Sequence, residues 1–351
     1  VSFRGKFKPV DVLIDFTSIE AIRGALRDAP GPSTRAQGET TTREATLTKP
    51  PGSLGRLEDI SAWLAAWQDR APPKVENPQV IVFAGNHGIA ARGVSAYPAE
   101  VTAQMVANFE TGGAAVNQLS KTAGATFRVM PIKLEEPTAD FSDAPAMDET
   151  AFIEAFNIGS NTVDPNCDLL CIGEMGIANT TSAAAVCHAL FGDEAADWVG
   201  PGTGITGDTI SLKTDLVRDA VQFHLNETSD PIDILRRLGG RELAAMAGAI
   251  TRARHSKTPV LIDGYVVGAA AAALEQAHPG SLDHALCAHV SAEPGHQRLL
   301  VKLGKSALLD LGMRLGEASG AALAINLVRA AADCHAGMAT FADAGVTDKT
   351  D

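Results

Sequence analysis

The chain has 351 residues, and at about 150 residues a domain this length suggests two units. Hydrophobic residues make up 45% and charged residues 20%, so the chain can bury a large core and is not disordered as a whole. The net charge is −13. A general binder of nucleic acid is therefore excluded, because phosphate backbones require clustered Lys and Arg.

Five cysteines are few for this length and odd in number, so we expect free thiols rather than a disulfide framework. The longest alanine-rich apolar run, residues 266–274, is too short for a membrane span, which needs about 20 residues. No apolar stretch follows the basic residues at positions 4, 6 and 8, so we expect no signal peptide. Together these features favour a cytoplasmic protein without a membrane partner.

The first 78 residues show helical patterns but no strand pattern. A helix is predicted over residues 19–27, followed by a Gly/Pro/Ser/Thr-rich link over 30–42. Two prolines and a glycine at 50–52 keep the next segment from being helical. A second helix is predicted over 57–68, with Ile60, Leu64 and Trp67 on one face. Residues 71–78 carry three prolines and are typical of a linker.

From residue 80 onward, short apolar runs alternate with helical patterns. The runs lie at 80–84, 125–130, 168–172, 259–262, 286–290 and 307–311. The helical patterns lie at 98–119, 179–190, 208–225, 241–254, 266–277, 295–303 and 317–335, and an acid-rich loop is predicted over 134–150. Continuous apolar runs are typical of parallel strands buried on both faces. The alternation predicts an α/β fold with a doubly wound, mostly parallel, six-stranded Rossmann-like sheet.

The two ends of the chain lack strands, so we expect them to form a smaller helical domain together. The predicted division has an N-terminal helical segment over 1–78 and a C-terminal helix over 317–351, both in the small domain. Residues 79–316 then form the α/β domain that binds nucleotide and base.

Ligands of such sheets bind beyond the carboxyl ends of the strands. Glycines and polar or acidic residues gather after the predicted strands, at 85–88, 173–181, 263–265, 291–296 and 312–317, and before a helix at 200–204. One such loop is ordinary turn chemistry. Six loops on one edge predict a lined pocket.

Two of these loops suit a phosphate. Gly200–Gly204 is either a plain turn or a cradle of backbone N–H groups, but it lacks the Gly-Lys-Ser/Thr of a Walker A loop. Asn179-Thr180-Thr181 begins a helix, where a cap and an anion use the same unpaired N–H groups. Lys213 and Arg314 are surface charges by default. Arg314 follows a buried strand, which favours a phosphate or carboxylate partner.

Two acids, Glu174 and Glu317, each follow a glycine at a predicted strand end. Each is either a solvated or capping acid or a general base in the pocket.

His87 in Gly-Asn-His-Gly either caps a turn or lines the pocket. The histidine spacings match no zinc site, so no metal is predicted. No dinucleotide fingerprint follows the first strand, and no cofactor is predicted.

Taken together, several ordered motifs from about residue 45 to the end resemble the nicotinate-nucleotide–dimethylbenzimidazole phosphoribosyltransferases of cobalamin biosynthesis. They are Lys-Pro-Pro-Gly-Ser-Leu-Gly-Arg-Leu-Glu at 49–58, Ser-Ala-Tyr-Pro at 95–98, Val-Thr-Ala-Gln-Met at 101–105, Gly-Glu-Met-Gly-Ile at 173–177, Asn-Thr-Thr at 179–181, Gly-Pro-Gly-Thr-Gly at 200–204, Gly-Arg-Glu at 240–242, Ser-Ala-Glu at 291–293 and Leu-Gly-Glu-Ala-Ser-Gly at 315–320.

The resemblance implies transfer of the 5-phosphoribosyl group from nicotinate mononucleotide to 5,6-dimethylbenzimidazole by a homodimer. It implies that Glu317 is the catalytic base and Glu174 a second pocket acid. The implied nucleotide and phosphate contacts are Gly176, Ile177, Asn179, Thr180, Gly202, Thr203, Gly204, Lys213, Asp263, Gly264, Ser291, Arg314 and Gly316. The implied benzimidazole contacts are Tyr97, Gln104, Met105 and Met175.

This sequence departs from the family pattern at two positions. Asn86 stands where the family commonly has Asp, and Ala178 stands where it commonly has Gly. Ala178 is costly if the backbone there needs a positive φ. Two other classes stay open on the residues alone: a nicotinamide-dinucleotide oxidoreductase, against which the missing fingerprint counts, and a nucleotide-sensing protein, which would not need Glu317.

Overall fold

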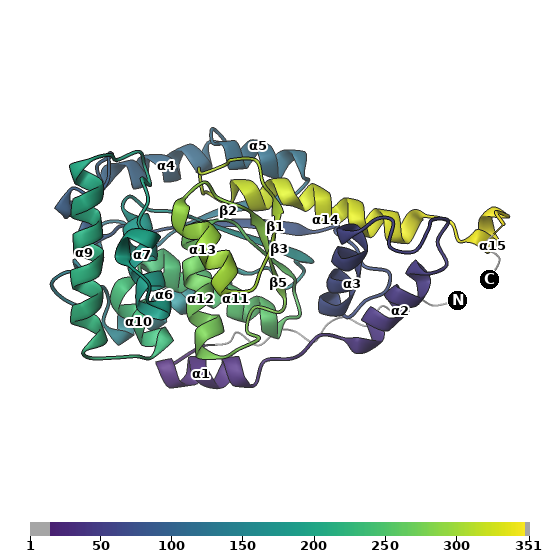
Figure 1. The fold of residues 1–351 in the computed structure, drawn as a ribbon, viewed down its shortest axis with the longest axis horizontal. Helices are drawn as coiled ribbons and strands as arrows, with labels where there is room; N and C mark the ends of the chain where they lie inside the picture. The colour runs from purple at the N-terminus through teal and green to yellow at the C-terminus, as the bar shows by residue number, and fades with distance from the viewer. Residues whose placement is uncertain (1–14, 348–351) are drawn as a thin grey trace.

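The computed structural model describes residues 15–347. A six-stranded sheet lies at its centre, with strand order β2-β1-β3-β4-β5-β6 and every pairing parallel (Figure 1). The strands are β1 (Pro78–Ala84), β2 (Thr126–Pro131), β3 (Leu169–Met175), β4 (Val260–Ile262), β5 (Ala285–His289) and β6 (Ala307–Leu309). All six predicted strands are confirmed. The strand order switches between β1 and β3: β2 is added on one side of β1, and β3 to β6 are added on the other. Doubly wound sheets bind their ligands at such a switch point.

Fifteen α-helices and one 3-10 turn surround or extend the sheet in the described residues. They are α1 (Ile19–Arg27), α2 (Thr34–Glu44), α3 (Arg56–Gln68), η1 (Gly88–Arg92), α4 (Glu100–Glu110), α5 (Ala115–Thr122), α6 (Glu149–Thr162), α7 (Asn179–Phe191), α8 (Ala195–Trp198), α9 (Asp208–Leu225), α10 (Pro231–Leu238), α11 (Arg241–His255), α12 (Tyr265–Ala277), α13 (Pro294–Lys302), α14 (Ser319–Gly337) and α15 (Phe341–Ala344).

The sheet is buried on both faces, as the continuous apolar runs predict. In β1, Ile81 and Phe83 belong to one core cluster, while Val80 and Val82 belong to the other. Successive side chains of a strand point to opposite faces, so both faces must be covered. Buried residues of α6, α7, α11 and α12 share the cluster on the first face, and those of α3, α5 and α14 share the cluster on the second (Figure 1).

The segment before α3 and the segment after α14 lie side by side at one end of the molecule (Figure 1). Thr48 donates its backbone N–H to Ala339 (3.1 Å), and Phe341 donates to Thr46 (3.0 Å). By contrast, α1 packs on α12 and buries Ile22 in the core beside the sheet. The first half of α14 also lies against the sheet. The predicted division at residues 78 and 316 therefore stays a prediction, and α1 contacts the larger part.

Three local expectations were wrong. The predicted link over 30–42 contains α2, which begins at the cap Ser33 and lacks an apolar stripe that would have revealed it. The predicted helix over 98–119 is two helices, because the chain breaks at Gly112, whose φ is +81°. The acid-rich loop at 134–150 is not fully solvated, since Phe141 and Met147 are buried. Helices α6, α8 and α10 had no predicted counterpart.

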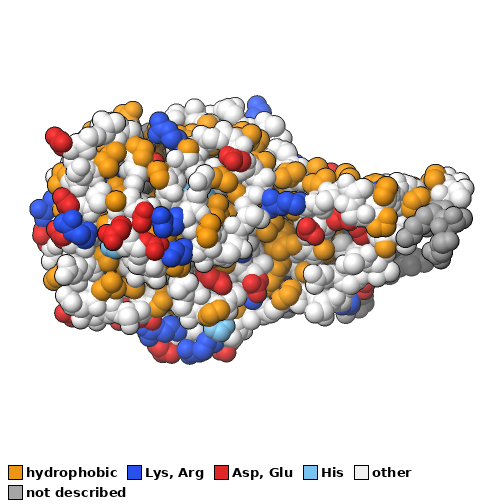
Figure 2. Space-filling view, viewed as in Figure 1, with side chains coloured by type: hydrophobic (Ala, Val, Ile, Leu, Met, Phe, Trp, Pro, Cys, Tyr) orange, Lys and Arg blue, Asp and Glu red, His pale blue; other side chains and the backbone are white. Residues whose placement is uncertain are grey.

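The surface carries no single-sign patch on the face shown in Figure 2. Basic and acidic side chains are interspersed there. Surface ion pairs of the described residues include Arg298 with Asp193 and Asp197. All five cysteines are free thiols, as expected. The predicted absence of a signal peptide concerns residues outside the described range. Within residues 15–347, no helix is both long and apolar enough to cross a bilayer.

Candidate active site

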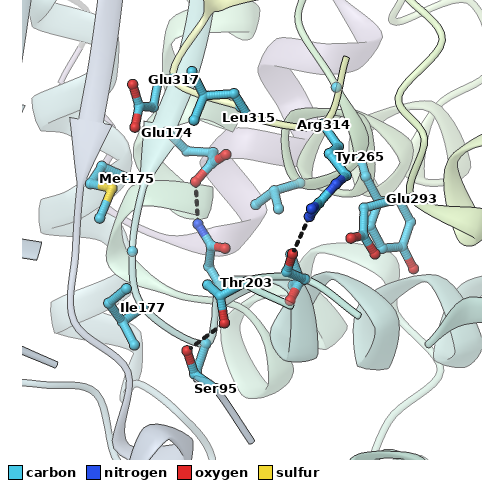
Figure 3. A pocket seen from close by; sticks show the side chains of 18 of the residues that line it. Ser95, Glu174, Met175, Ile177, Thr203, Tyr265, Glu293, Arg314, Leu315 and Glu317 are labelled. Atoms are coloured by element: carbon cyan, nitrogen blue, oxygen red, sulfur yellow. Dashed lines mark hydrogen bonds between the residues drawn. The ribbon is translucent and has the colours of Figure 1, made fainter. Parts of the chain in front are cut away.

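A cavity of about 520 Å³ opens at the carboxyl ends of the strands, beside the point between β1 and β3 where the strand order switches. This volume suits a small-molecule site. Fifteen of the nineteen site residues predicted from the sequence line it: Tyr97, Met105, Glu174, Met175, Gly176, Ile177, Asn179, Thr180, Gly202, Thr203, Gly264, Ser291, Arg314, Gly316 and Glu317. The loops that the sequence places after separate strands thus meet in one site (Figure 3).

Four predicted residues lie elsewhere. Gln104 is exposed on α4 and does not line the cavity. Gly204 closes a turn, donating its N–H to Pro201 (2.8 Å). Lys213 is fully buried behind the cavity. Asp263 is 1% exposed and accepts a hydrogen bond from Ala321 N at the start of α14, so it faces a helix rather than the cavity.

Sequence reasoning missed further lining residues, among them Tyr265, His289 and Glu293. Glu293 is 5% exposed, and its carboxylate lies near the backbone N–H of Gly202 and the charges of Lys213 and Arg314. Burial raises its pKa, against the pull of Lys213. The sequence signal that could have identified Glu293 as a site residue is its position two residues after Ser291, in the loop that follows β5. His289 lies at the end of β5, inside a run that was predicted only as core.

Glu317 is buried and turns its carboxyl into the cavity (Figure 3). Burial raises the pKa of this carboxyl to about 7, and the nearby charge of Asp263 adds to the effect. The residue does not open α14 as predicted, since that helix begins two residues later, at Ser319. A carboxyl with a pKa near neutrality is suited to accept a proton during a reaction.

Glu174 stands close by, near the end of β3. Its Oε2 accepts a hydrogen bond from the amide of Asn179, the first residue of α7. Burial raises its pKa to about 8, opposed by this hydrogen bond and supported by the charges of Glu242, Asp263 and Glu317. A Cβ on Gly316 would collide with Glu174 Oε1, so glycine there lets the two acidic loops meet.

The N-terminus of α7 forms the part of the cavity wall next to Glu174. Its N-cap, Ala178, has φ +75°, so the left-handed conformation that makes alanine costly is present. The N–H of Ile177 already donates to Thr102 Oγ1 (3.2 Å), and that of Asn179 to Gly176 O (3.2 Å). A ligand anion is therefore left with the other donors of this turn and with the positive end of the helix dipole.

Two cations flank this end. Lys213 Nζ donates to Thr180 Oγ1 (2.9 Å) and Gly200 O (3.1 Å), and burial lowers its pKa to about 8. Arg314 Nη1 donates to Gly202 O (3.3 Å) from the exposed side (Figure 3). Thr203 Oγ1 joins the glycine loop to Ser95 Oγ and to Ala96 N, each at 3.0 Å. The cavity is thus flanked by two cations and lined by three acids, and one of these acids, Glu293, lies near both cations.

The remaining wall is apolar. Val101, Met105, Met175, Ile177 and Leu315 line it together with Tyr97. Such a surface suits a flat aromatic ring. His87 is the N-cap residue of η1, but its side chain makes no capping hydrogen bond and does not line the cavity. The side chain is buried, with Nε2 at 2.5 Å from Glu242 Oε1 and Nδ1 at 3.0 Å from Ser182 Oγ.

Buried acids beside a helix N-terminus and two cations, in a cavity at the strand ends of an α/β sheet, suit an enzyme that acts on a small phosphorylated substrate. The phosphoribosyltransferase family profile matches residues 29–346. The chain belongs to this family.

Curated relatives carry the name nicotinate-nucleotide–dimethylbenzimidazole phosphoribosyltransferase. One from Ruegeria sp. (strain TM1040) is 55% identical over 96% of this chain and 100% of its own length. One from Brucella anthropi is 54% identical over 93% of this chain and 96% of its own. The crystal structure of CobT from Thermus thermophilus superposes with a TM-score of 0.84 at 37% identity, covering 90% of this chain and all of that one.

Proposed function

We propose that this chain transfers the 5-phosphoribosyl group from nicotinate mononucleotide to 5,6-dimethylbenzimidazole, giving α-ribazole 5′-phosphate and nicotinate. The observation that carries the proposal is the pair of buried acids, Glu317 and Glu174, in a cavity that also holds a helix N-terminus flanked by two cations. The family and its named relatives support the same reaction.

Glu317 is assigned as the general base. One benzimidazole nitrogen attacks C1′ of the ribose, and the other must lose its proton as the new bond forms. The Glu317 carboxylate accepts that proton. The C1′–N bond to nicotinate breaks, and its electron pair moves onto the ring nitrogen, which loses its positive charge. Attack on the face opposite the leaving group converts a β-nucleotide into an α-product.

The remaining groups bind and orient the substrates. The phosphate lies at the N-terminus of α7, near Thr180, Gly202 and Arg314, with Lys213 behind. The benzimidazole packs between Met175, Met105 and Leu315 near the acids. Glu174 is largely protonated at pH 7, because its pKa is raised to about 8, so it can donate as well as accept a hydrogen bond. Holding both rings on opposite faces of one ribose accounts for much of the rate enhancement.

We also propose a homodimer in the cytoplasm. Tyr97 and Leu315 line the cavity yet expose 55% of their surface each, and Leu311 exposes 60%, so apolar side chains stand open near the mouth. The free thiols suit a reducing compartment. Light scattering during gel filtration should give twice the chain mass of 36.5 kDa. A mass of one chain at working concentration contradicts the dimer.

The test of the reaction is chromatographic. The purified chain is incubated with nicotinate mononucleotide and 5,6-dimethylbenzimidazole, and the expected result is equimolar α-ribazole 5′-phosphate and nicotinate. Reactions lacking either substrate serve as controls. Tight binding of the nucleotide without any product would instead support a nucleotide-sensing protein.

A further inference from the structure

The turn that carries Glu317 has a strained backbone. Gly316, Glu317 and Ala318 have φ values of +79°, +60° and +59° in succession. The left-handed region is sterically costly for residues with a Cβ, and such residues usually occur there singly. Two in a row persist only where the surroundings hold them, and strain of this kind gathers at functional sites. Contacts from outside the turn must therefore fix its conformation.

Asp263 provides such a contact from the end of β4. Its Oδ1 accepts a hydrogen bond of 2.9 Å from the backbone N–H of Ala321, the third residue of α14. The N-cap of this helix, Ala318, has no side-chain acceptor. The first N–H groups of a helix lack partners within it, and an N-cap Ser or Asp normally supplies one. Asp263 performs this capping role from another element.

Other groups around the turn also act on this carboxylate. Burial raises the pKa of Asp263 to about 6, while His289 and the backbone N–H groups of Ala321, Gly320 and Ala318 act in the opposite direction. Asp263 is therefore mostly ionised at neutral pH. Its side chain is almost fully buried and does not line the cavity, so its effect on a bound substrate passes through the turn.

Two glycines let the turn approach the sheet closely. A Cβ on Gly173 of β3 would collide with the backbone N of Ala318, and a Cβ on Gly320 would collide with Cδ2 of His289. The turn is thus pressed between β3 and β5, with Asp263 holding it from the end of β4. From this turn, Glu317 lines the cavity (Figure 3).

We propose that Asp263 is a positioning residue, which caps α14 across the sheet edge and thereby keeps the Glu317 carboxyl turned toward the reacting base. The inference rests on the proposed function for its kinetic readout. It replaces the direct nucleotide contact that the family resemblance implies for Asp263. The carboxylate has a second effect: its negative charge disfavours a negative charge on Glu317 and makes Glu317 the stronger base.

Other ionisable groups also face Glu317. They are Glu174 from β3, His289 from β5 and Arg314 from the same loop, all on the cavity wall. Two of them also respond to Asp263, since His289 Nε2 lies 3.6 Å from Asp263 Oδ1 and the charge of Asp263 helps to raise the pKa of Glu174. The acidic limb is assigned to Glu317 because Glu317→Gln should lack it.

The experiment compares Asp263→Ala and Asp263→Asn with the wild-type chain in the product assay. The wild type is measured first: no product from it contradicts the proposed function, whereas product from it makes the variants interpretable. Asp263→Ala removes the cap, and kcat should fall by about tenfold or more, since misplacing a catalytic group is costly. The KM values should change by less than about threefold, because no substrate contact is lost.

Asp263→Asn keeps an Oδ1 acceptor for Ala321 but removes the charge. Its kcat at high pH should stay within about threefold of wild type, a rescue that the alanine variant lacks. The acidic limb of its kcat/KM profile should move to lower pH, because Glu317 loses a repelling neighbour. A raised nucleotide KM with unchanged kcat in Asp263→Ala would overturn the proposal in favour of a direct contact.

A double variant separates positioning from general stability. Ala318→Gly removes the steric cost of the left-handed conformation, so it should restore part of the kcat lost in Asp263→Ala. If Asp263→Ala does not fold, the pH shift in Asp263→Asn alone decides, and an unshifted limb overturns the proposal. If Asp263→Ala folds with lower Tm and normal kcat, Asp263 only stabilises the fold.

Discussion

Lys213 Nζ lies 2.9 Å from Thr180 Oγ1, so a buried cation stands directly behind the first turn of α7. The lysine is fully buried, and its Nζ also donates to Gly200 O in the second phosphate loop. One charge thus links both loops without reaching the cavity surface. Arg314 approaches the same end of the cavity from the exposed side.

Replacing Lys213 and replacing Arg314 should therefore have different effects on substrate binding and on stability. Arg314→Ala is expected to raise the KM for nicotinate mononucleotide and leave Tm unchanged, because Arg314 is exposed. Lys213→Met keeps the volume and removes the charge and both hydrogen bonds, so it should raise KM and lower Tm together. Steady-state kinetics and thermal melts of both variants measure this. Unchanged KM in both would mean that the loops bind the phosphate alone.

Glu317→Gln tests the base. The amide keeps the size but cannot accept the proton, so kcat should fall by about 10²-fold or more. Binding of nicotinate mononucleotide should change little, since Glu317 is assigned to the incoming ring. Folding raises the pKa of Glu317 from its ordinary 4.5 to about 7, so the stability this group contributes in acid is lost as pH rises to 7. The variant should therefore be at least as stable as wild type at pH 8. Near-normal kcat would move the base to Glu174 or to water.

The pH dependence of kcat/KM should also reflect the titration of Glu317. Glu317 must be deprotonated, so kcat/KM should rise with pH through about 7, the pKa of this carboxyl. Glu174 and Lys213 each have a pKa of about 8, so a fall is expected above that value. Glu317→Gln should lack the acidic limb, while any limb due to substrate ionisation remains in both enzymes. An acidic limb that persists unchanged in this variant contradicts the assignment.

Ala178 offers a test of backbone strain with a matched control. Ala178→Gly loses a buried methyl worth about 0.8 kcal/mol but relieves a left-handed alanine that costs roughly 1–2 kcal/mol. Ala184 is equally buried in the interior of α7, where glycine costs about 1 kcal/mol in addition to the methyl. Denaturant unfolding should show Ala178→Gly near neutral and Ala184→Gly clearly destabilised. Equal losses would mean that the surroundings remove the strain.

Activity should be full in excess chelator. The leaving nicotinate becomes less positive as it departs, so no metal has to neutralise a developing charge. Residues 15–347 also contain no group of three His, Cys, Asp or Glu side chains placed to share an ion. Initial rates with and without chelator measure this. Activity lost on chelation and restored by Mg²⁺ contradicts it.

Much of the fold was predictable because a strand that is buried on both faces has a continuous apolar sequence. The run Val80-Ile81-Val82-Phe83-Ala84 has no polar residue, and such a run fits a central parallel strand. The polar helix α2 left no such mark, since only Ala36 and Thr40 are buried along it. The start of α14 near Glu317 was also misplaced. Glu317 and Ala318 both have positive φ, and no local sequence pattern predicts that conformation for two successive residues other than glycine.

The sequence by itself determined which loops meet at the site, because every parallel strand delivers its following loop to the same edge of the sheet. It could not decide which of their residues face the cavity. Lys213 and Asp263 both lie near the cavity, yet tertiary packing turned one behind Thr180 and the other toward the N-terminus of α14. The pKa values of Glu174 and Glu317 were likewise decided only by the structure, since burial and neighbouring charges raise them and neither is written in local sequence.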